Sequence, residues 1–192
     1  YDINPDKTSA IHLGFNNFKK ELNNKKSNFI LYVGARRRYK NFEVLLNAFS
    51  LSKELVKEYK IICVGGGNFI KTEIEKFKKL NLIDQMVYYN ATDSELRELY
   101  EKASVYVTTS LSEGFGLPAL EAMNSGCIVL ASNIKVYQEI LKDYAVFFNP
   151  NEPEDLKNKL ENIIFKKNFT QENIEKAFNY SSTFTWKKCA IE

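Results

Sequence analysis

Short apolar runs alternate with amphipathic segments along most of the chain, and this alternation limits the folds that it can adopt. A continuous run such as FILYV at residues 29–33 is typical of a strand that is buried on both faces. The next segment carries four apolar residues at the spacing of one helix face: Phe42, Leu45, Leu46 and Phe49. Strands and helices alternate in this way about six times, which predicts an α/β fold, a Rossmann-like doubly wound parallel sheet with helices on both faces. The runs that we expect at the centre of the sheet begin near residues 29, 60, 87, 105 and 127.

The other elements follow from periodicity and capping signals. Thr92 and Glu95 have the spacing of a capping box, so we expect a helix to begin at residue 93. Further helices are predicted over about 69–80, 134–142, 153–166 and 170–192, and a short strand over 145–148. Trp186 is the largest apolar residue of the last segment and is expected to anchor it. Residues 8–15 suggest a short strand and the polar residues 16–28 a linker, so we assign 1–28 to an interdomain segment and linker and 29–192 to one domain.

The stretch EGFGLPALE at residues 113–121 lies between a predicted strand and a predicted helix. Gly114 and Gly116 permit a tight turn and a close approach of a ligand to the backbone, and Pro118 suits the first helical position. Backbone amides in such a turn suit a phosphate, whereas the carboxylates of Glu113 and Glu121 suit sugar hydroxyls. The combination predicts a nucleotide sugar as ligand. The alternative is structural, because glycine turns are common in α/β proteins and the helix dipole alone favours an early Glu.

A second loop, after the strand at 29–33, carries a dense positive charge. Arg36, Arg37, Arg38 and Lys40 precede Asn41, which could cap the following helix. The carboxyl edge of a doubly wound sheet is where ligands bind, so these side chains are candidates for a phosphate site or form a solvated basic loop. The glycine triplet at 65–67 could face a phosphate too, although packing between strand and helix is the interpretation that we favour.

Composition excludes few functions. A net charge of +3 is too small to indicate nucleic-acid binding, and no apolar run approaches the ~20 residues of a membrane span. The three cysteines lack paired spacing, and Cys63 and Cys127 fall in predicted strands, which indicates reduced core thiols in a cytosolic protein. No Asp-x-Asp pair occurs and the single histidine, His12, has no metal partner, so we expect no metal. The chain begins at Tyr1 rather than Met, and we expect it to be part of a longer protein.

The pattern E-G-F-G-L-P-x-L-E-A-M, followed by Gly126 and Val129, resembles the signature of the family 4 retaining glycosyltransferases of the GT-B fold. The segment YVGARRRYKNFEVLLNAF resembles the first strand, phosphate loop and helix of this family's donor domain, in a spelling similar to that of bacterial mannosyltransferases of surface polysaccharide synthesis. The family commonly has Arg directly after the glycine, where this chain has Ala35, so the resemblance leaves the phosphate contact open among Arg36, Arg37 and Arg38.

The resemblance implies roles for particular residues. Lys40 and Arg36 would act on the diphosphate and Glu113 beside the donor sugar, while the other donor-binding positions would be Arg37, Asn90, Thr92, Gly114, Phe115, Gly116, Leu117 and Glu121, the last on the ribose hydroxyls. The implied substrate is a GDP- or UDP-linked sugar, with no further cofactor, and the acceptor, a saccharide or a lipid-linked group, would bind an upstream N-terminal domain. This chain would then be the donor-binding half, inactive alone, of an enzyme that is cytoplasmic or lies at the inner face of the membrane. A GT-B epimerase or hydrolase and a non-catalytic binding module remain as alternatives.

Overall fold

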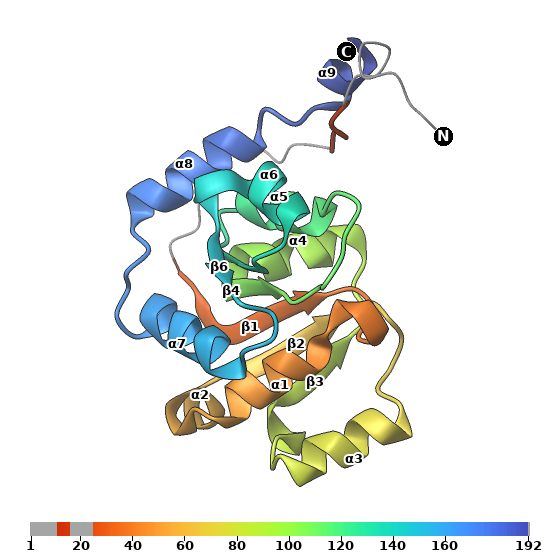
Figure 1. The fold of residues 1–192 in the computed structure, drawn as a ribbon, viewed down its shortest axis with the longest axis vertical. Coiled ribbons are helices and arrows are strands. Elements are labelled where there is room, and N and C mark those ends of the chain that lie inside the picture. Colours follow the sequence, from red (N-terminus) through yellow and green to blue (C-terminus); the bar gives the residue numbers. More distant parts are fainter. Residues whose placement is uncertain (1–10, 16–24, 192) are drawn as a thin grey trace.

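The computed structural model describes residues 11–15 and 25–191, which form a six-stranded parallel sheet between two layers of helices (Figure 1). The strands are β1 (Ser27–Val33), β2 (Lys60–Val64), β3 (Met86–Tyr89), β4 (Ala103–Thr108), β5 (Val129–Ser132) and β6 (Val146–Phe148). Their order is β3-β2-β1-β4-β5-β6, and Leu31 in the central β1 pairs with Ile62 on one side and Tyr106 on the other. This is the predicted Rossmann-like doubly wound sheet, and its order reverses between β1 and β4.

The helices divide between the faces of the sheet, with α1 and α7 on one side of β1 and α4, α5 and α6 on the other (Figure 1). One layer holds α1 (Phe42–Ser50), α2 (Lys53–Glu58), α3 (Lys71–Lys79) and α7 (Pro153–Ile164). The other holds α4 (Asp93–Lys102), α5 (Leu117–Asn124), α6 (Lys135–Leu141) and α8 (Gln171–Ser181). Alternate residues of β1 enter the two cores, Ile30 and Tyr32 on one face and Phe29 and Leu31 on the other, because successive strand side chains point to opposite faces.

Short elements complete the described chain: the 3-10 helices η2 (Arg38–Lys40), η3 (Ile83–Gln85) and η4 (Lys142–Tyr144), and α9 (Trp186–Ile191). The capping box before α4 is confirmed, since Glu95 accepts a hydrogen bond from the Thr92 amide at 2.8 Å. The buried thiols are confirmed as well: Cys63 lies in β2 with no exposed surface and Cys127, just before β5, is 2% exposed. Within the described ranges, no helix has both the length and the apolar character of a membrane span.

Several structural predictions are wrong. The strand at 86–89 lies at the edge of the sheet rather than at its centre, where the partly exposed rings of Tyr88 and Tyr89 suit a half-covered strand. The last segment forms two helices, α8 and α9, and Trp186 is 51% exposed while Phe184 is 8% exposed, so Phe184 is the buried anchor. Residues 11–15 are not a strand. Asn41 precedes α1 without a side-chain cap, because its backbone is left-handed (φ 50°) rather than extended, and its side-chain nitrogen Nδ2 donates to the Pro150 carbonyl at 2.8 Å. Residues 8–10 and most of the predicted linker, 16–24, lie outside the described residues, and the domain boundary after residue 28 stays a prediction.

Candidate functional site

The loops that follow β1 and β4 meet at the point where the strand order reverses, and they bring Lys40 and Glu113 together. The Nζ atom of Lys40 lies 2.7 Å from Oε1 of Glu113, with only 23% and 16% of the two side chains exposed. Two further hydrogen bonds join the loops. The Leu111 amide donates to the Tyr39 carbonyl at 2.7 Å, and the Thr109 hydroxyl donates to the Lys40 carbonyl at 2.6 Å. The crevice beyond the carboxyl ends of the strands at this point is the usual ligand site of an open α/β sheet.

The carboxylate of Glu113 is fixed through one of its two oxygens. Oε1 accepts hydrogen bonds from Lys40, from Ser110 at 2.6 Å and from the hydroxyl of Tyr137 at 3.3 Å, and Tyr137 also lies 2.7 Å from the Thr108 hydroxyl. Burial raises the pKa of Tyr137 far above its usual range, so its hydroxyl stays protonated and can donate. Oε2 of Glu113 accepts no hydrogen bond from any residue that the structure describes, which leaves one oxygen for a hydroxyl of a ligand.

The glycine loop supplies backbone donors next to this pair. The amides of Gly114, Phe115 and Gly116 donate to no acceptor within the described part of the chain, and α5 begins directly afterwards at Leu117. Pro118 therefore occupies the second helical position rather than the first, where its missing amide hydrogen is equally harmless. Unpaired amides together with the positive end of a helix form a site that favours an anion.

Gly116 is required by its surroundings as well as by its backbone. Its φ of +97° lies in the left-handed region, which side chains with a Cβ rarely adopt. A Cβ at this position would also lie 2.6 Å from the ring of Tyr137. The tyrosine that holds Glu113 thus packs directly against the glycine loop. These groups enclose a pocket of about 250 Å³ whose walls include Lys40, Glu113, Phe115, Gly116 and Tyr137.

The arginines of the basic loop divide into one buried and two exposed side chains. Arg36, which we expected at the phosphate, has a side chain only 2% exposed, and it donates to the carbonyls of Gly65 at 2.8 Å and Gly67 at 2.7 Å. Its Nε lies 2.9 Å from Oε1 of Glu73. The donors of Arg36 thus face these groups and not the pocket, and its contact with a phosphate stays a prediction. Arg37 and Arg38 are exposed, and neither side chain has a hydrogen-bond or ion-pair partner among the described residues.

The glycine triplet packs against the basic loop, not between strand and helix as we favoured. All three residues, 65–67, have positive φ, which turns the carbonyls of the first and third toward Arg36. A Cβ on Gly66 would lie 3.0 Å from the Gly34 carbonyl oxygen, so the close approach of the two loops needs glycine.

Glu121 lines a second pocket of about 280 Å³, which adjoins the first through Leu117. The hydroxyl of Tyr100 donates to its Oε2 at 3.3 Å. Burial raises the pKa of Glu121, and the nearby charge of Asp93 also raises it. The hydrogen bond from Tyr100 lowers this pKa, but by less than burial raises it. The expected pair of carboxylates, Glu113 and Glu121, is thus found on either side of the loop amides, each in its own pocket.

Asn90 and Thr92 are not brought into either pocket. Both are exposed in the loop between β3 and α4, and Thr92 is engaged in the capping box. Three residues that contact the carboxylates were not predicted. Ser110 and Tyr137 bond to Glu113, and Tyr100 bonds to Glu121, and no local signal in the sequence indicates these contacts.

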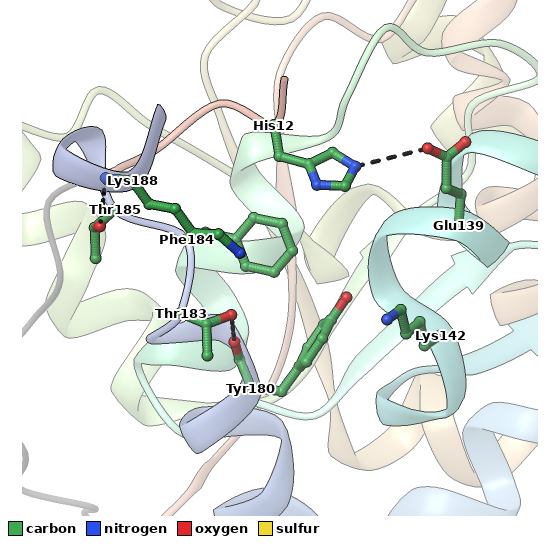
Figure 2. A pocket seen from close by; sticks show the side chains of 8 residues that line it. All are labelled: His12, Glu139, Lys142, Tyr180, Thr183, Phe184, Thr185 and Lys188. Atoms are coloured by element: carbon green, nitrogen blue, oxygen red, sulfur yellow. Dashed lines mark hydrogen bonds and ion pairs between the residues drawn. The ribbon is translucent and has the colours of Figure 1, made fainter. Parts of the chain in front are cut away.

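His12 lies among aromatic rings and one carboxylate. Figure 2 shows its imidazole directed at the carboxylate of Glu139 across a third pocket, with Nε2 3.7 Å from Oε1. The ring also lies 6.0 Å from that of Phe115 and 5.8 Å from that of Phe184, measured between centroids. In the parts of the chain that are described, no group of three or more His, Cys, Asp or Glu side chains is arranged to hold a metal ion.

Several known proteins are similar to this chain in sequence or in fold. The sequence model of a family described as "Glycosyl transferases group 1" matches residues 15–180. The chain is 30% identical over 166 residues, 85% of its length and 46% of the relative's, to the O-antigen chain mannosyltransferase RfbU of Salmonella typhimurium. It is also 30% identical over 172 residues, 84% of its length and 20% of the relative's, to the serotype-specific mannosyltransferase WbdA of Escherichia coli.

A similar fold occurs in WaaG, a glycosyltransferase involved in lipopolysaccharide biosynthesis. Its crystal structure superposes with a TM-score of 0.82 at 18% identity, over 100% of this chain and 58% of that one. The chain thus spans less than half the length of the two curated relatives, 46% and 20%.

Proposed function

Since the chain belongs to the group 1 glycosyl transferases, we propose that it forms the donor-binding part of an enzyme that transfers a hexosyl group from a nucleoside-diphosphate sugar to an acceptor hydroxyl, with retention of configuration. By likeness to RfbU and WbdA, the group is a mannosyl and the product a bacterial surface polysaccharide or glycolipid. The reaction would occur in the cytoplasm, at the inner face of the membrane if the acceptor is lipid-linked. It converts the donor and an acceptor hydroxyl into the glycoside, the nucleoside diphosphate and one proton.

One observation carries this proposal: Lys40 and Glu113 meet at the reversal of the strand order, beside three backbone amides without acceptors among the described residues. Negative charge grows on the diphosphate as its bond to the sugar breaks. A cation and helix-terminal amides that are already in place stabilise this charge without reorganising. Oε2 of Glu113 would accept a hydrogen bond from a sugar hydroxyl or stabilise positive charge on the sugar ring, and Glu121 would hold the ribose.

Glu113 is not assigned as a covalent nucleophile. A double displacement of the kind used by retaining hydrolases needs a second carboxylic acid about 5 Å away. Glu113 is the only Asp or Glu among the described residues that line its pocket.

Calorimetry with a nucleoside diphosphate and the corresponding nucleoside tests the donor site. Lys40→Ala should weaken binding of the diphosphate about 10- to 100-fold, because a hydrogen bond to a charged group is lost, and should leave nucleoside binding nearly unchanged. Lys53→Ala, at an exposed position of α2, is the matched control and should bind both ligands as the parent does. Equal losses for the two ligands with Lys40→Ala would contradict the assignment of Lys40 to the diphosphate.

Product analysis with the full-length protein tests the transfer step. Formation of a glycoside from donor and acceptor would separate a transferase from an epimerase, which returns an isomeric donor, and from a hydrolase, which returns free sugar. Efficient transfer by this chain alone would contradict its role as one half of the enzyme.

A further inference from the structure

Tyr137 connects the glycine loop, the carboxylate of Glu113 and the sheet. It lies on α6 and is 2% exposed, and its hydroxyl is 3.3 Å from Oε1 of Glu113 and 2.7 Å from the hydroxyl of Thr108 in β4. The edge of its ring packs on Gly116, where a Cβ would lie 2.6 Å from Cε1 of the ring. One side chain therefore contacts both the carboxylate assigned to the sugar and the loop whose amides are assigned to the diphosphate.

The two hydrogen bonds of this hydroxyl can run in one direction only. A tyrosine hydroxyl has a single hydrogen, and an ionised carboxylate accepts hydrogen bonds but cannot donate one. Tyr137 therefore donates to Glu113, and the hydroxyl of Thr108 donates to Tyr137. Because β4 lies inside the sheet, between β1 and β5, these two bonds connect the carboxylate to a strand that is paired on both sides.

The other two side chains that donate to Oε1 of Glu113 within the described ranges hold it differently. Ser110 belongs to the same loop, three positions earlier, so its bond moves with that loop. Lys40 has to divide its ammonium hydrogens between Glu113 and the diphosphate once a nucleotide sugar binds. The hydroxyl of Tyr137 is not required by the diphosphate, and its burial keeps water from competing for its hydrogen. Tyr137 is therefore the partner that can keep Glu113 in place while the ligand is bound.

We propose that Tyr137 is a positioning residue for the donor sugar: it turns the carboxylate of Glu113 so that Oε2 faces the sugar hydroxyls. This rests on the proposed function, because it presumes that Glu113 binds the sugar of a nucleotide sugar. The terminal torsion of a glutamate side chain has no sharp preference of its own, so the direction of the carboxylate is set by its hydrogen bonds. Removing the hydroxyl of Tyr137 should let the carboxylate rotate and weaken its contact with the sugar.

Calorimetry of the purified chain with two pairs of probes tests the inference: GDP with GDP-mannose, and UDP with UDP-glucose. The measured quantity is the dissociation constant of the sugar nucleotide divided by that of the diphosphate, for the pair that binds more tightly. Tyr137→Phe keeps the ring against Gly116 and removes only the hydroxyl. It should raise this ratio about 3- to 10-fold and leave the binding of the diphosphate nearly unchanged. The rise is smaller than the ~10- to 100-fold of a whole hydrogen bond to a charged group, because Lys40 and Ser110 still hold Glu113.

A double-mutant cycle with Glu113→Ala separates positioning from packing. Glu113→Ala removes the carboxylate and should itself raise the ratio about 10- to 100-fold. Tyr137→Phe on this background should cause no further rise, because the hydroxyl then has no carboxylate to orient. If Tyr137 only supported the fold, Tyr137→Phe would weaken both ligands to a similar extent, with or without Glu113.

Tyr180→Phe is the matched control. It also removes one tyrosine hydroxyl with a single acceptor, since Tyr180 donates to the Ile140 carbonyl at 2.8 Å. Tyr180 is partly buried and lines neither of the two pockets assigned to the nucleotide sugar. This variant should keep the ratio of the parent, and urea titrations of all the variants show whether each one is folded.

The outcomes separate this inference from the proposed function. If Tyr137→Phe leaves the ratio unchanged, or raises it as much in the Glu113→Ala background as in the parent, the positioning role of Tyr137 is wrong and the donor site stands. If neither the diphosphates nor the sugar nucleotides bind to the parent chain, the proposed function and the inference both fail.

Discussion

Replacing Arg36 by alanine should destabilise the fold, although Arg36 belongs to a loop that looks like a phosphate site. Its side chain is 2% exposed, and the guanidinium donates hydrogen bonds to the carbonyls of Gly65 and Gly67 and to the carboxylate of Glu73. It also lies 5.0 Å from the centroid of the Phe69 ring, within the range of a cation–π contact. The substitution removes the positive charge and leaves all of these partners in place.

The loss in the free energy of unfolding can be estimated from the Glu73 carboxylate, which is left without its partner. Removing one partner of a buried ion pair typically costs about 3–5 kcal/mol, because the other charge is left buried and uncompensated. Since 15% of the Glu73 side chain is exposed, water can reach it, and we take the lower end, about 3 kcal/mol. For a chain of this length, 1 kcal/mol shifts Tm by about 2–4 °C, so the expected fall is about 6–12 °C.

Thermal and urea unfolding followed by circular dichroism measure this cost. Arg37→Ala is the matched control: the neighbouring side chain is exposed and unpartnered within the described chain, so its loss should change the free energy of unfolding by less than about 0.5 kcal/mol. Adding Glu73→Gln to Arg36→Ala should recover part of the loss, because the buried carboxylate loses its charge. If Arg36→Ala unfolds like Arg37→Ala, the ion pair does not stabilise the fold and the argument is refuted.

Two further substitutions test the two pockets. Gly116→Ala should lower the free energy of unfolding by more than the ~1–2 kcal/mol of a left-handed alanine, because its Cβ would also overlap Tyr137, and a smaller loss in urea titrations would contradict this packing. Burial raises the pKa of Glu121 in the folded chain above 4.5. Between pH 4.5 and the raised pKa, the folded chain therefore keeps a proton that the unfolded chain has released. The free energy of unfolding of the parent should consequently fall as pH rises through this window. Glu121→Gln should flatten this fall in urea titrations on either side of pH 4.5, and an unchanged pH profile would show that Glu121 is not the cause.

Much of this architecture could be predicted because its signals are local. A buried parallel strand is a run of consecutive apolar residues, and the loops after the strands are punctuated by glycine. The meeting of Lys40 and Glu113, 73 positions apart, follows from one further rule, that the carboxyl ends of parallel strands share an edge and that loops converge where the strand order reverses.

What escaped prediction depends on contacts between distant segments. Nothing local distinguishes Arg36 from Arg37, because the burial of Arg36 depends on carbonyls that the glycine triplet turns toward it from 29 and 31 positions away. The fixing of Glu113 by Tyr137 depends in the same way on how α6 packs against the glycine loop. The edge position of β3 depends on the strand order, which the apolar runs alone do not encode.

The pair of Lys40 and Glu113 restricts how a diphosphate can be attracted to the pocket. The two formal charges cancel, so the pair as a whole offers an anion little long-range attraction. Among the described residues, positive sources near Lys40 in the chain or at the glycine loop include the start of α5, equivalent to about half a charge, and the exposed Arg37 and Arg38. Charges in solvent act over about 8 Å at physiological ionic strength, so the two arginines can speed the arrival of an anion and make it sensitive to salt. Lys40 has a different task under this arrangement: Glu113 holds its ammonium group in place before the ligand arrives, so that it can stabilise the charge that develops on the departing diphosphate without having to move.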